Sequence, residues 1–265
     1  MNESSESLIS ASNKLIYISN AGVLIQLKDR KILIDGLCRS NNPIYKDPSP
    51  EIAQKIKGGI PPFNDLDLML ITHEHSDHFD PVSVDEFSKN NPGTVILSTP
   101  NVITKLRTYD SMEMDKEQAN LIEFNLNLHQ EETLNFQGMK IRIISLAHMG
   151  KNQEETQNYA YLIEYGLKLL HVGDADAVSE NYNQLNLVPQ KIDYLIAPFP
   201  YISIPSARRV IKDYINPQKI AVLHFPHKEL DHFGWIKATR KSFANVKEAF
   251  IKTNFLEELG TTLIL

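Results

Sequence analysis

Residues 66–81 read LDLMLITHEHSDHFDP. Residues 66–72 of this stretch form a short apolar run, which predicts a buried strand. The run ends abruptly in HEHSDHFD, and Asp80 followed by Pro81 is typical of the cap and first turn of a helix. We therefore expect a histidine-rich loop at the end of a strand, where side chains can converge on one point.

Three histidines and one aspartate lie close together in this loop, namely His73, His75, Asp77 and His78. Residues two apart in a tight turn can point the same way, so His73 and His75 can share one metal ion. Asp77 and His78 can then reach a second ion. Imidazole and carboxylate ligands suit Zn, Fe, Mn or Co. The helical HExxH motif of zinc proteases is excluded, because Asp77 stands where that motif needs its second histidine. The competing interpretation is a solvated, metal-free loop.

Composition limits the class of protein. The chain has 265 residues, of which 42% are hydrophobic and 23% charged, as in ordinary globular proteins. Its net charge of -6 argues against a general attraction to nucleic acid or anionic lipid. A single cysteine, Cys38, excludes an internal disulfide. No signal peptide or apolar stretch of ~20 residues is visible, so we expect a cytoplasmic protein, although a leader removed earlier stays open.

The remaining pattern predicts strands that come first and then alternate with helices. Residues 14–27 and 31–34 are expected to form two strands of a hairpin, and a helix is expected around Val246. Residues 114–124 fit a helix or a strand equally well. This order indicates two layers of sheet covered by helices. We expect residues 1–265 to form one domain, with residues 1–12 flexible.

The motif His73-Glu74-His75-Ser76-Asp77-His78 resembles HxHxDH, the first motif of the metallo-β-lactamase superfamily. The later parts of the family pattern have counterparts in SLAHMG (145–150), LLHVGDAD (169–176) and IAVLHFP (220–226). The resemblance covers nearly the whole chain and implies an α/β (α+β) protein with a four-layer αββα sandwich. The spacing is most similar to the ascorbate-6-phosphate lactonase-like branch of metal-dependent hydrolases.

The resemblance also implies a role for each residue of the pattern. The first of two divalent ions, zinc or alternatively Mn or Fe, would be held by His73, His75 and His148. The second ion would be held by Asp77, His78 and His224. Asp174 would bridge both ions, and Asp35 would orient the histidine loop without binding metal.

Several alternatives stay open at this stage. His148 could be a core histidine. Asp176 competes with Asp174, and His227 competes with His224 or lines the pocket as a substrate contact. His171, inside a predicted strand, is expected to be packed.

Such a centre would use a metal-bound hydroxide to hydrolyse an ester, lactone or phosphoester of a small molecule. Asp77 would be the catalytic residue, as ligand and proton acceptor. Residues 37–62 and 199–204 are expected to form pocket walls, with aromatic side chains from Tyr45, Phe63, Phe199 and Tyr201. A phosphorylated substrate would call for a cation such as Arg39, Lys151, Arg208 or Arg209.

Three rival functions remain. A tRNA-processing or β-CASP-type nuclease would use similar ligands, but the acidic balance argues against it. A mononuclear iron dioxygenase would keep the same ligand types, and an inactive metal-binding module is the third alternative. We expect a small-molecule substrate and no nucleic-acid or membrane partner, and self-association into a homo-oligomer stays open.

Overall fold

The computed structural model describes residues 13–109, 120–250 and 252–265, and its strands form two seven-stranded sheets. In spatial order, the first sheet consists of β14 (Thr262–Ile264), β1 (Lys14–Tyr17), β2 (Val23–Leu27), β3 (Arg30–Ile34), β4 (Leu68–Leu70), β5 (Val95–Ser98) and β6 (Leu121–Glu123). The second sheet consists of β13 (Thr253–Phe255), β12 (Lys219–Leu223), β11 (Tyr194–Pro198), β10 (Lys168–His171), β9 (Gln157–Glu164), β8 (Met139–Ala147) and β7 (Glu131–Phe136).

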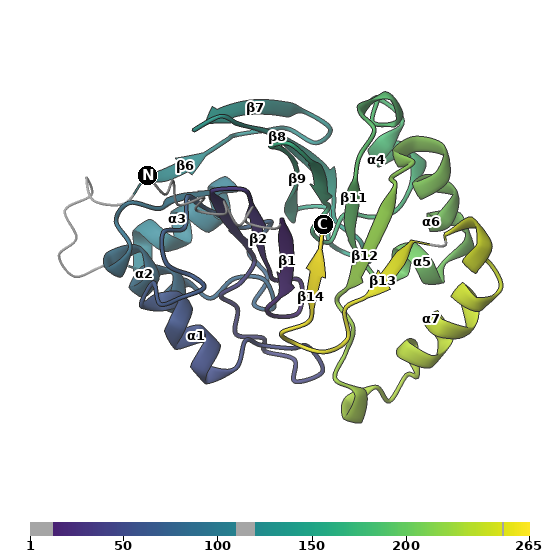
Figure 1. The fold of residues 1–265 in the computed structure, drawn as a ribbon, viewed down its shortest axis with the longest axis horizontal. Helices are drawn as coiled ribbons and strands as arrows, with labels where there is room; N and C mark the ends of the chain where they lie inside the picture. Colours follow the sequence, from purple (N-terminus) through teal and green to yellow (C-terminus); the bar gives the residue numbers. More distant parts are fainter. Residues whose placement is uncertain (1–12, 110–119, 251) are drawn as a thin grey trace, which may run out of the picture.

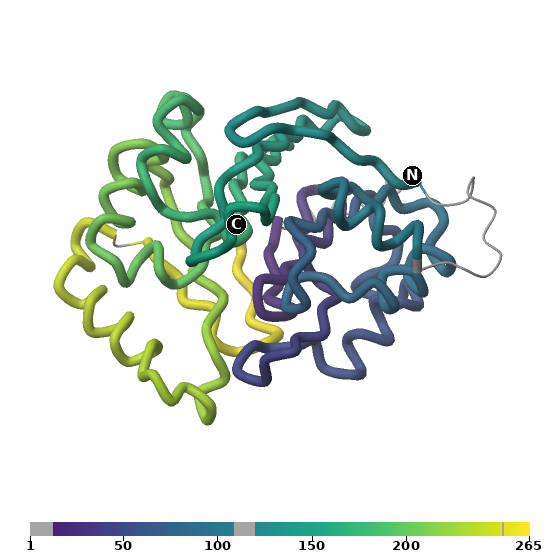
Figure 2. The backbone as a smooth tube through the Cα atoms, turned by 180° about the vertical axis from the view of Figure 1, so that it is seen from behind, coloured from purple at the N-terminus to yellow at the C-terminus, as the bar shows by residue number. Residues whose placement is uncertain are grey.

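Helices cover the outer face of each sheet (Figure 1). The first sheet carries α1 (Pro50–Lys57), α2 (Pro81–Asn90) and α3 (Pro100–Tyr109). The second carries α4 (Ser179–Tyr182), α5 (Pro200–Ser203), α6 (Pro205–Val210), the π-helix η2 (Ile211–Ile215) and α7 (Trp235–Ala244). Short 3₁₀ turns are η1 (Val188–Gln190), η3 (Lys228–Leu230) and η4 (Lys247–Ala249). The predicted four-layer αββα sandwich is confirmed. In Figure 2 the N-terminal half, in purple and blue, lies on the right, and the C-terminal half, in green and yellow, lies on the left.

Each central strand is buried on both faces, and this creates three hydrophobic cores. In β2, Val23 and Ile25 face the core between the sheets, while Leu24 faces the core beneath α1, α2 and α3. Successive side chains of a strand point to opposite faces, so an uninterrupted apolar run satisfies both layers. The rigid sheets then hold their loops in fixed positions.

Four strand ends meet at one rim of the sandwich. His73 follows β4, His148 follows β8, Asp174 follows β10 and His224 follows β12. A β-bridge pairs His148 with Ala175, and the Met149 amide donates to the Asp174 carbonyl over 2.8 Å. These contacts fasten the loops after β8 and β10 to each other.

Some predicted elements are confirmed and others are wrong. The helix that begins at Pro81 is α2, with the Asp80 carboxylate accepting from the Ser83 amide over 3.1 Å. The single strand predicted for residues 14–27 is wrong, because a turn at residues 18–22 divides it into β1 and β2. The Ile18 amide donates to the Gly22 carbonyl over 2.8 Å, which reverses the chain there.

At the helix predicted around Val246, the structure has the short 3₁₀ helix η4, which begins directly after Val246. The α-helix that precedes it, α7, ends at Ala244. Its start is set by Asp231, whose carboxylate accepts from the amides of Trp235 and Ile236 over 2.8 and 2.9 Å. The edge strands β7 and β13 were not predicted. In the ambiguous stretch 114–124, the structure has β6, and residues 110–119 lie outside the described residues, as does the expected flexible segment 1–12.

Within the described ranges, every helix is too short or too polar to cross a lipid bilayer.

Candidate metal centre

Asp35, directly after β3, holds the histidine loop in place through hydrogen bonds with Thr72 and His78. Its side chain is buried, and one carboxylate oxygen accepts from the Thr72 amide over 2.8 Å. The other oxygen accepts from the Thr72 hydroxyl over 2.7 Å and lies 2.8 Å from Nδ1 of His78. A carboxylate has no proton to donate, so Nδ1 of His78 carries the proton. Nε2 of His78 is therefore left with its lone pair facing the site.

Thr72 passes the same orientation on to His73. The Thr72 hydroxyl gives its one proton to Asp35, and it lies 3.0 Å from Nδ1 of His73. The hydroxyl must then accept from Nδ1–H of His73, which leaves the lone pair of Nε2 on the side of the cluster. Thr72, directly before the motif, thus selects the tautomer that a metal ligand requires, and its position in the sequence alone does not indicate this role.

The first ligand cluster consists of His73, His75 and His148. Nε2 of His73 lies 3.0 Å from Nδ1 of His75 and 3.2 Å from Nε2 of His148. Nδ1 of His148 donates to the Met149 carbonyl over 2.5 Å, so its Nε2 also presents a lone pair. Two nitrogen lone pairs facing each other at this distance repel unless a cation lies between them. The geometry therefore fits a metal ion bound by three imidazoles.

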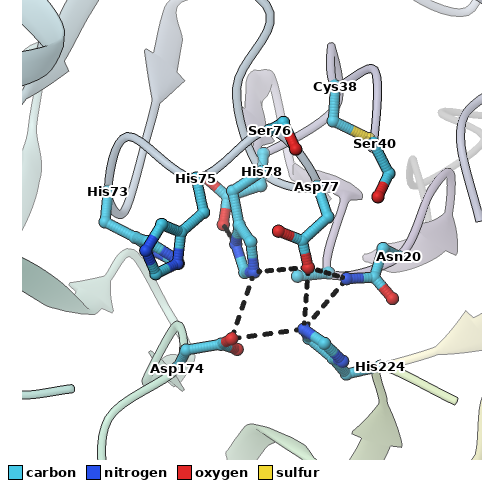
Figure 3. Close-up of polar contacts among 12 residues, drawn as sticks. Asn20, Cys38, Ser40, His73, His75, Ser76, Asp77, His78, Asp174 and His224 are labelled. Atoms are coloured by element: carbon cyan, nitrogen blue, oxygen red, sulfur yellow. Dashed lines mark hydrogen bonds and ion pairs between the residues drawn. The ribbon is translucent and has the colours of Figure 1, made fainter. Parts of the chain in front are cut away.

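The second ligand cluster consists of Asp77, His78, Asp174 and His224 (Figure 3). Oδ2 of Asp174 lies 3.2 Å from Nε2 of His224 and 3.4 Å from Nε2 of His78. Nε2 of His78 and Oδ1 of Asp174 are buried and have no hydrogen-bond partner. Unpartnered buried polar atoms are costly, and a divalent cation would satisfy both.

Asp174 also faces the first cluster, since its Oδ2 lies 3.8 Å from Nε2 of His148. The carboxylate thus stands between the clusters, as expected for a bridging ligand. The competing Asp176 is in neither cluster.

The electrostatics of the second cluster favour bound positive charge. Burial lowers the pKa of His224, but the Asp174 carboxylate outweighs it and raises the pKa to about 9. Burial likewise raises the pKa of Asp174, but His224 and His78 hold it well below its usual range. The Asp174 carboxylate is therefore ionised near neutral pH and stabilises a neighbouring cation. In the first cluster, burial and then the neighbouring His78 imidazole hold the pKa of His73 well below its usual range, so His73 is a neutral ligand.

Two residues with a positive φ, Gly173 and His224, help to position the ligands. Gly173 has φ +57°, and a Cβ there would lie 2.4 Å from Oδ1 of Asn158 and 2.9 Å from Cβ of Thr72. The same Asn158 oxygen accepts from the Asp174 amide over 2.9 Å, so the close approach fixes the ligand that follows. His224 itself adopts φ +66°, which is uncommon outside glycine and often found at functional sites.

Asn20 is a site residue that the sequence analysis missed. It lies in the turn between β1 and β2 and is fully buried. Its Nδ2 lies 2.9 Å from Oδ2 of Asp77 and 2.9 Å from Nε2 of His224 (Figure 3). Its carbonyl accepts from the His224 amide over 3.0 Å. The only signal in the sequence was the turn-forming run SNAG at residues 19–22, which alone indicates no site.

Other candidates lie away from the two clusters. His227 is half-buried at the start of η3 and donates its amide to the Ile44 carbonyl over 2.7 Å. His171 is buried, with Nε2 3.1 Å from the Ala21 carbonyl. The prediction that Phe63 and Tyr201 line the pocket is wrong. Phe63 packs in the core beneath the helices of the first sheet, and the Tyr201 hydroxyl is buried against the Ala175 carbonyl at 2.9 Å.

A pocket of about 580 Å³ opens onto both clusters. Asp77, Asp174 and His224 line it, together with His75 and His148 of the first cluster. Its volume is in the range of small-molecule sites.

Tyr45 and Phe199, two of the expected aromatic wall residues, line this pocket. The ring of Tyr45 contacts that of His224 edge-on, with centroids 4.9 Å apart. Burial, followed by the charges of Asp77 and Asp174, raises the pKa of Tyr45 to about 12. The pocket therefore brings an uncharged phenol beside the second cluster.

A family model described as the β-lactamase superfamily domain matches residues 42–202. This is more than half of the 265 residues, so the chain belongs to the β-lactamase superfamily. The matched range contains the histidine loop, His148 and Asp174, while Asp35 and His224 lie outside it. A search of curated proteins found no match.

Solved structures with the same fold share little sequence with the chain. The metallo-β-lactamase fold protein YhfI from Bacillus subtilis is 16% identical with a TM-score of 0.60, over 95% of this chain and 99% of that one. An isothiocyanate hydrolase from Delia radicum gut bacteria is 14% identical with a TM-score of 0.65, over 95% and 99%. CmlA, a diiron β-hydroxylase from Streptomyces venezuelae, is 16% identical with a TM-score of 0.61, over 96% of this chain and 54% of that one. The fold is thus that of the metallo-β-lactamases.

Proposed function

We propose that the protein is a metal-dependent hydrolase that cleaves an ester, lactone or phosphoester of a small molecule. The observation that carries this proposal is the meeting of two ligand clusters at the floor of one pocket. Membership of the β-lactamase superfamily supports it. The motif spacing favours the lactonase-like branch, which makes lactones and simple esters the first compounds to test.

Divalent ions held by the two clusters would polarise the scissile carbonyl or phosphoryl group and activate water. The side chains of the protein itself would orient the histidine ligands and accept a proton from water. Asp35 and Thr72 hold His73 and His78 with their Nε2 atoms facing inward. Asp77 lines the pocket, and its Oδ2 accepts from Asn20. We propose that this carboxylate is both a ligand and the acceptor of a proton from water.

We further propose two ions and zinc as the metal, with Mn or Fe as alternatives, because all seven ligands offer nitrogen or oxygen atoms. The cytoplasm is the compartment we propose, in keeping with the free and buried Cys38. A small-molecule substrate, rather than nucleic acid or a membrane, is the partner we propose, and self-association is left to be measured.

The proposal is tested with purified protein supplied with Zn or Mn and offered lactones, carboxylic esters, thioesters and phosphodiesters. We expect hydrolysis of at least one class, lost on chelation and restored by metal. Asp77→Asn keeps the shape of the side chain and should lower kcat much more than metal content. A fully metal-loaded protein that hydrolyses none of these classes would contradict the proposal.

An iron-dependent oxygenase is the second candidate, favoured by the fold shared with the diiron β-hydroxylase. Iron is required by the oxygenase and is only one of the metals that the hydrolase could use, and the oxygenase alone consumes oxygen. Elemental analysis of protein purified without added metal, followed by an oxygen-consumption assay, separates them.

A further inference from the structure

The wall of the pocket above the ligand clusters is aromatic and aliphatic. Phe199 and Trp235 contact each other in this wall, and Tyr45 lies against His224, while Met149 and Ile204 add aliphatic surface. Besides the ligands, the polar groups of this wall within the described residues are the side chains of Gln153 and Ser203, the Tyr45 hydroxyl and the Trp235 indole N–H. Such a wall gains free energy by covering apolar surface of a ligand, at about 25 cal/mol per Å².

Four aromatic rings form a continuous row that runs from the core through the pocket wall to solvent. Phe225 is buried and stacks on Phe199, with centroids 5.4 Å apart and planes at 22°. Phe199 contacts Trp235 at 5.7 Å, and Trp235 stacks on Phe233 at 4.9 Å and 17°. Phe233 is 73% exposed. The stack on Trp235 thus continues the apolar surface of the pocket wall to the exposed ring of Phe233.

The cations near this wall do not reach into the pocket. Arg208 donates to the carbonyls of Ile202 and Ser203 over 2.6 and 3.2 Å, so its guanidinium is held by the backbone of the wall. The ammonium group of Lys46 is buried and donates to the Phe225 carbonyl over 2.7 Å. Of the described residues that line the pocket, none is a lysine or arginine.

A neighbouring hollow on the other side of His75 and Asp77 contains Lys105, but Glu74 lines the same hollow. The two charges are opposite, so this hollow supplies no net positive charge for a phosphate or carboxylate group.

We propose, on the basis of the hydrolase function proposed above, that the non-reacting part of the substrate is an uncharged aromatic or hydrocarbon group. This group lies along Phe199 and Trp235, while the ester or lactone group faces the ligand clusters. In the reaction, the acyl C–O bond breaks and the oxygen of water joins the acyl carbon. One proton of that water goes to the leaving oxygen and the other to solvent. A substrate with a phosphate or carboxylate tail would leave that charge facing apolar surface.

The test compares two ethyl esters with the same reacting group, ethyl 3-phenylpropanoate and monoethyl glutarate, by acid release at constant pH in the metal-loaded protein. We expect kcat/KM to be at least ~10-fold higher for the phenyl ester, which corresponds to about 1.4 kcal/mol. Phe199→Ala should lower kcat/KM for the phenyl ester more than for the glutarate ester, so that the ratio between the two esters falls. Equal or faster hydrolysis of the glutarate ester by the unmodified protein would overturn the inference while supporting a hydrolase.

Ile204→Lys places a cation on the wall at a position that is 46% exposed, where a lysine can be accommodated. This substitution should lower the ratio of kcat/KM for the phenyl ester to kcat/KM for the glutarate ester, or reverse the preference. The matched control is Val188→Lys, at an apolar position that is 40% exposed on η1 and outside the pocket wall, and it should leave the ratio unchanged. Equal effects of both substitutions would overturn the inference.

Binding is measured separately through fluorescence, because Trp235 is the one tryptophan of the sequence and lines the pocket. The probe 3-phenylpropanamide should change this fluorescence in a saturable way, and glutaramate should not. Saturable binding of the amide without hydrolysis of either ester would support the pocket assignment and count against the ester hydrolase. Absence of both binding and hydrolysis would overturn the pocket assignment.

Discussion

The two ligand clusters differ in the charge that they place around an ion. The first cluster consists of three imidazoles, whereas the second has two imidazoles and two carboxylates. Neutral nitrogen ligands suit zinc, while carboxylate oxygens also suit harder ions such as Mn. Asp35 supports both clusters, through His78 directly and through Thr72 to His73. One orienting carboxylate therefore serves two sites whose metal preferences can differ.

The largest effect is expected from Asp174→Asn. The substitution keeps the shape of the side chain but removes the charge that faces both clusters. We expect metal affinity to fall more than the ~10- to 100-fold typical of outer-shell partners, and metal-dependent stabilisation to be lost with it. Elemental analysis and thermal unfolding with added zinc measure this. Asp176→Asn, in the same loop but outside both clusters, is the control and should retain metal.

The next largest effect is a change in metal preference that differs between the two clusters. His75→Ala should leave the carboxylate-containing cluster able to bind and shift the bound metal towards Mn, because the imidazole cluster is impaired. His78→Ala should do the reverse and favour Zn. Each variant is dialysed against equal concentrations of Zn and Mn, and its metal content is determined. If both variants lost all metal, the clusters would form one indivisible centre and the comparison would fail.

Asp35→Asn should weaken both clusters together, by ~10- to 100-fold in metal affinity, because the amide no longer orients both histidines. The metal-free protein should also lose about 1–3 kcal/mol of unfolding free energy from unsatisfied buried groups. Metal titration and urea unfolding give the two quantities. Asp47→Asn is the control, since Asp47 accepts from the Ser40 amide over 2.8 Å and belongs to neither cluster. An effect confined to one cluster would contradict the shared support.

Asn20→Ala should affect the second cluster alone. The lost hydrogen bond to Asp77 is worth roughly 1 kcal/mol, so we expect about a fivefold weaker second ion and an unchanged first ion. Stepwise metal titration resolves the two events. A loss of equal size at both steps would show that Asn20 acts through the fold rather than through Asp77 and His224.

A pH-dependent effect on stability comes from the buried ammonium group of Lys46, which donates to the Phe225 carbonyl. Burial lowers the pKa of Lys46 to about 8 from a usual value of 10.5, so the unfolded chain binds the proton more tightly. Stability gained from this residue therefore rises as pH increases from 8 to 10.5. Relative to Lys46→Met, the unmodified protein should gain about 1–3 kcal/mol of unfolding free energy over that interval. Urea unfolding at several pH values measures the gain, and a flat difference would contradict it.

Local pattern was sufficient for much of the architecture. The apolar run at residues 66–72 and the cap formed by Asp80 predicted β4 and α2, because strand burial and helix capping depend on neighbouring residues. The division of residues 14–27 was not predictable from hydrophobicity, since Ile18 and Ala21 continue the apolar pattern through the turn. The start of α7 depends on a carboxylate four residues before Trp235, which no apolar period reveals.

The sequence alone determined the ligand types, because the motif at residues 73–78 and the later strand ends carry histidine and aspartate in a recognisable order. Three-dimensional packing decided which of the competing residues meet. It brought Asp174 rather than Asp176 between the clusters, and it placed Asn20 against Asp77 from 57 positions away. It also placed Phe199 and Trp235 at one pocket wall. The physical reason is that periodicity specifies which face of a strand is buried, whereas contacts across two sheets depend on how those strands pair and pack.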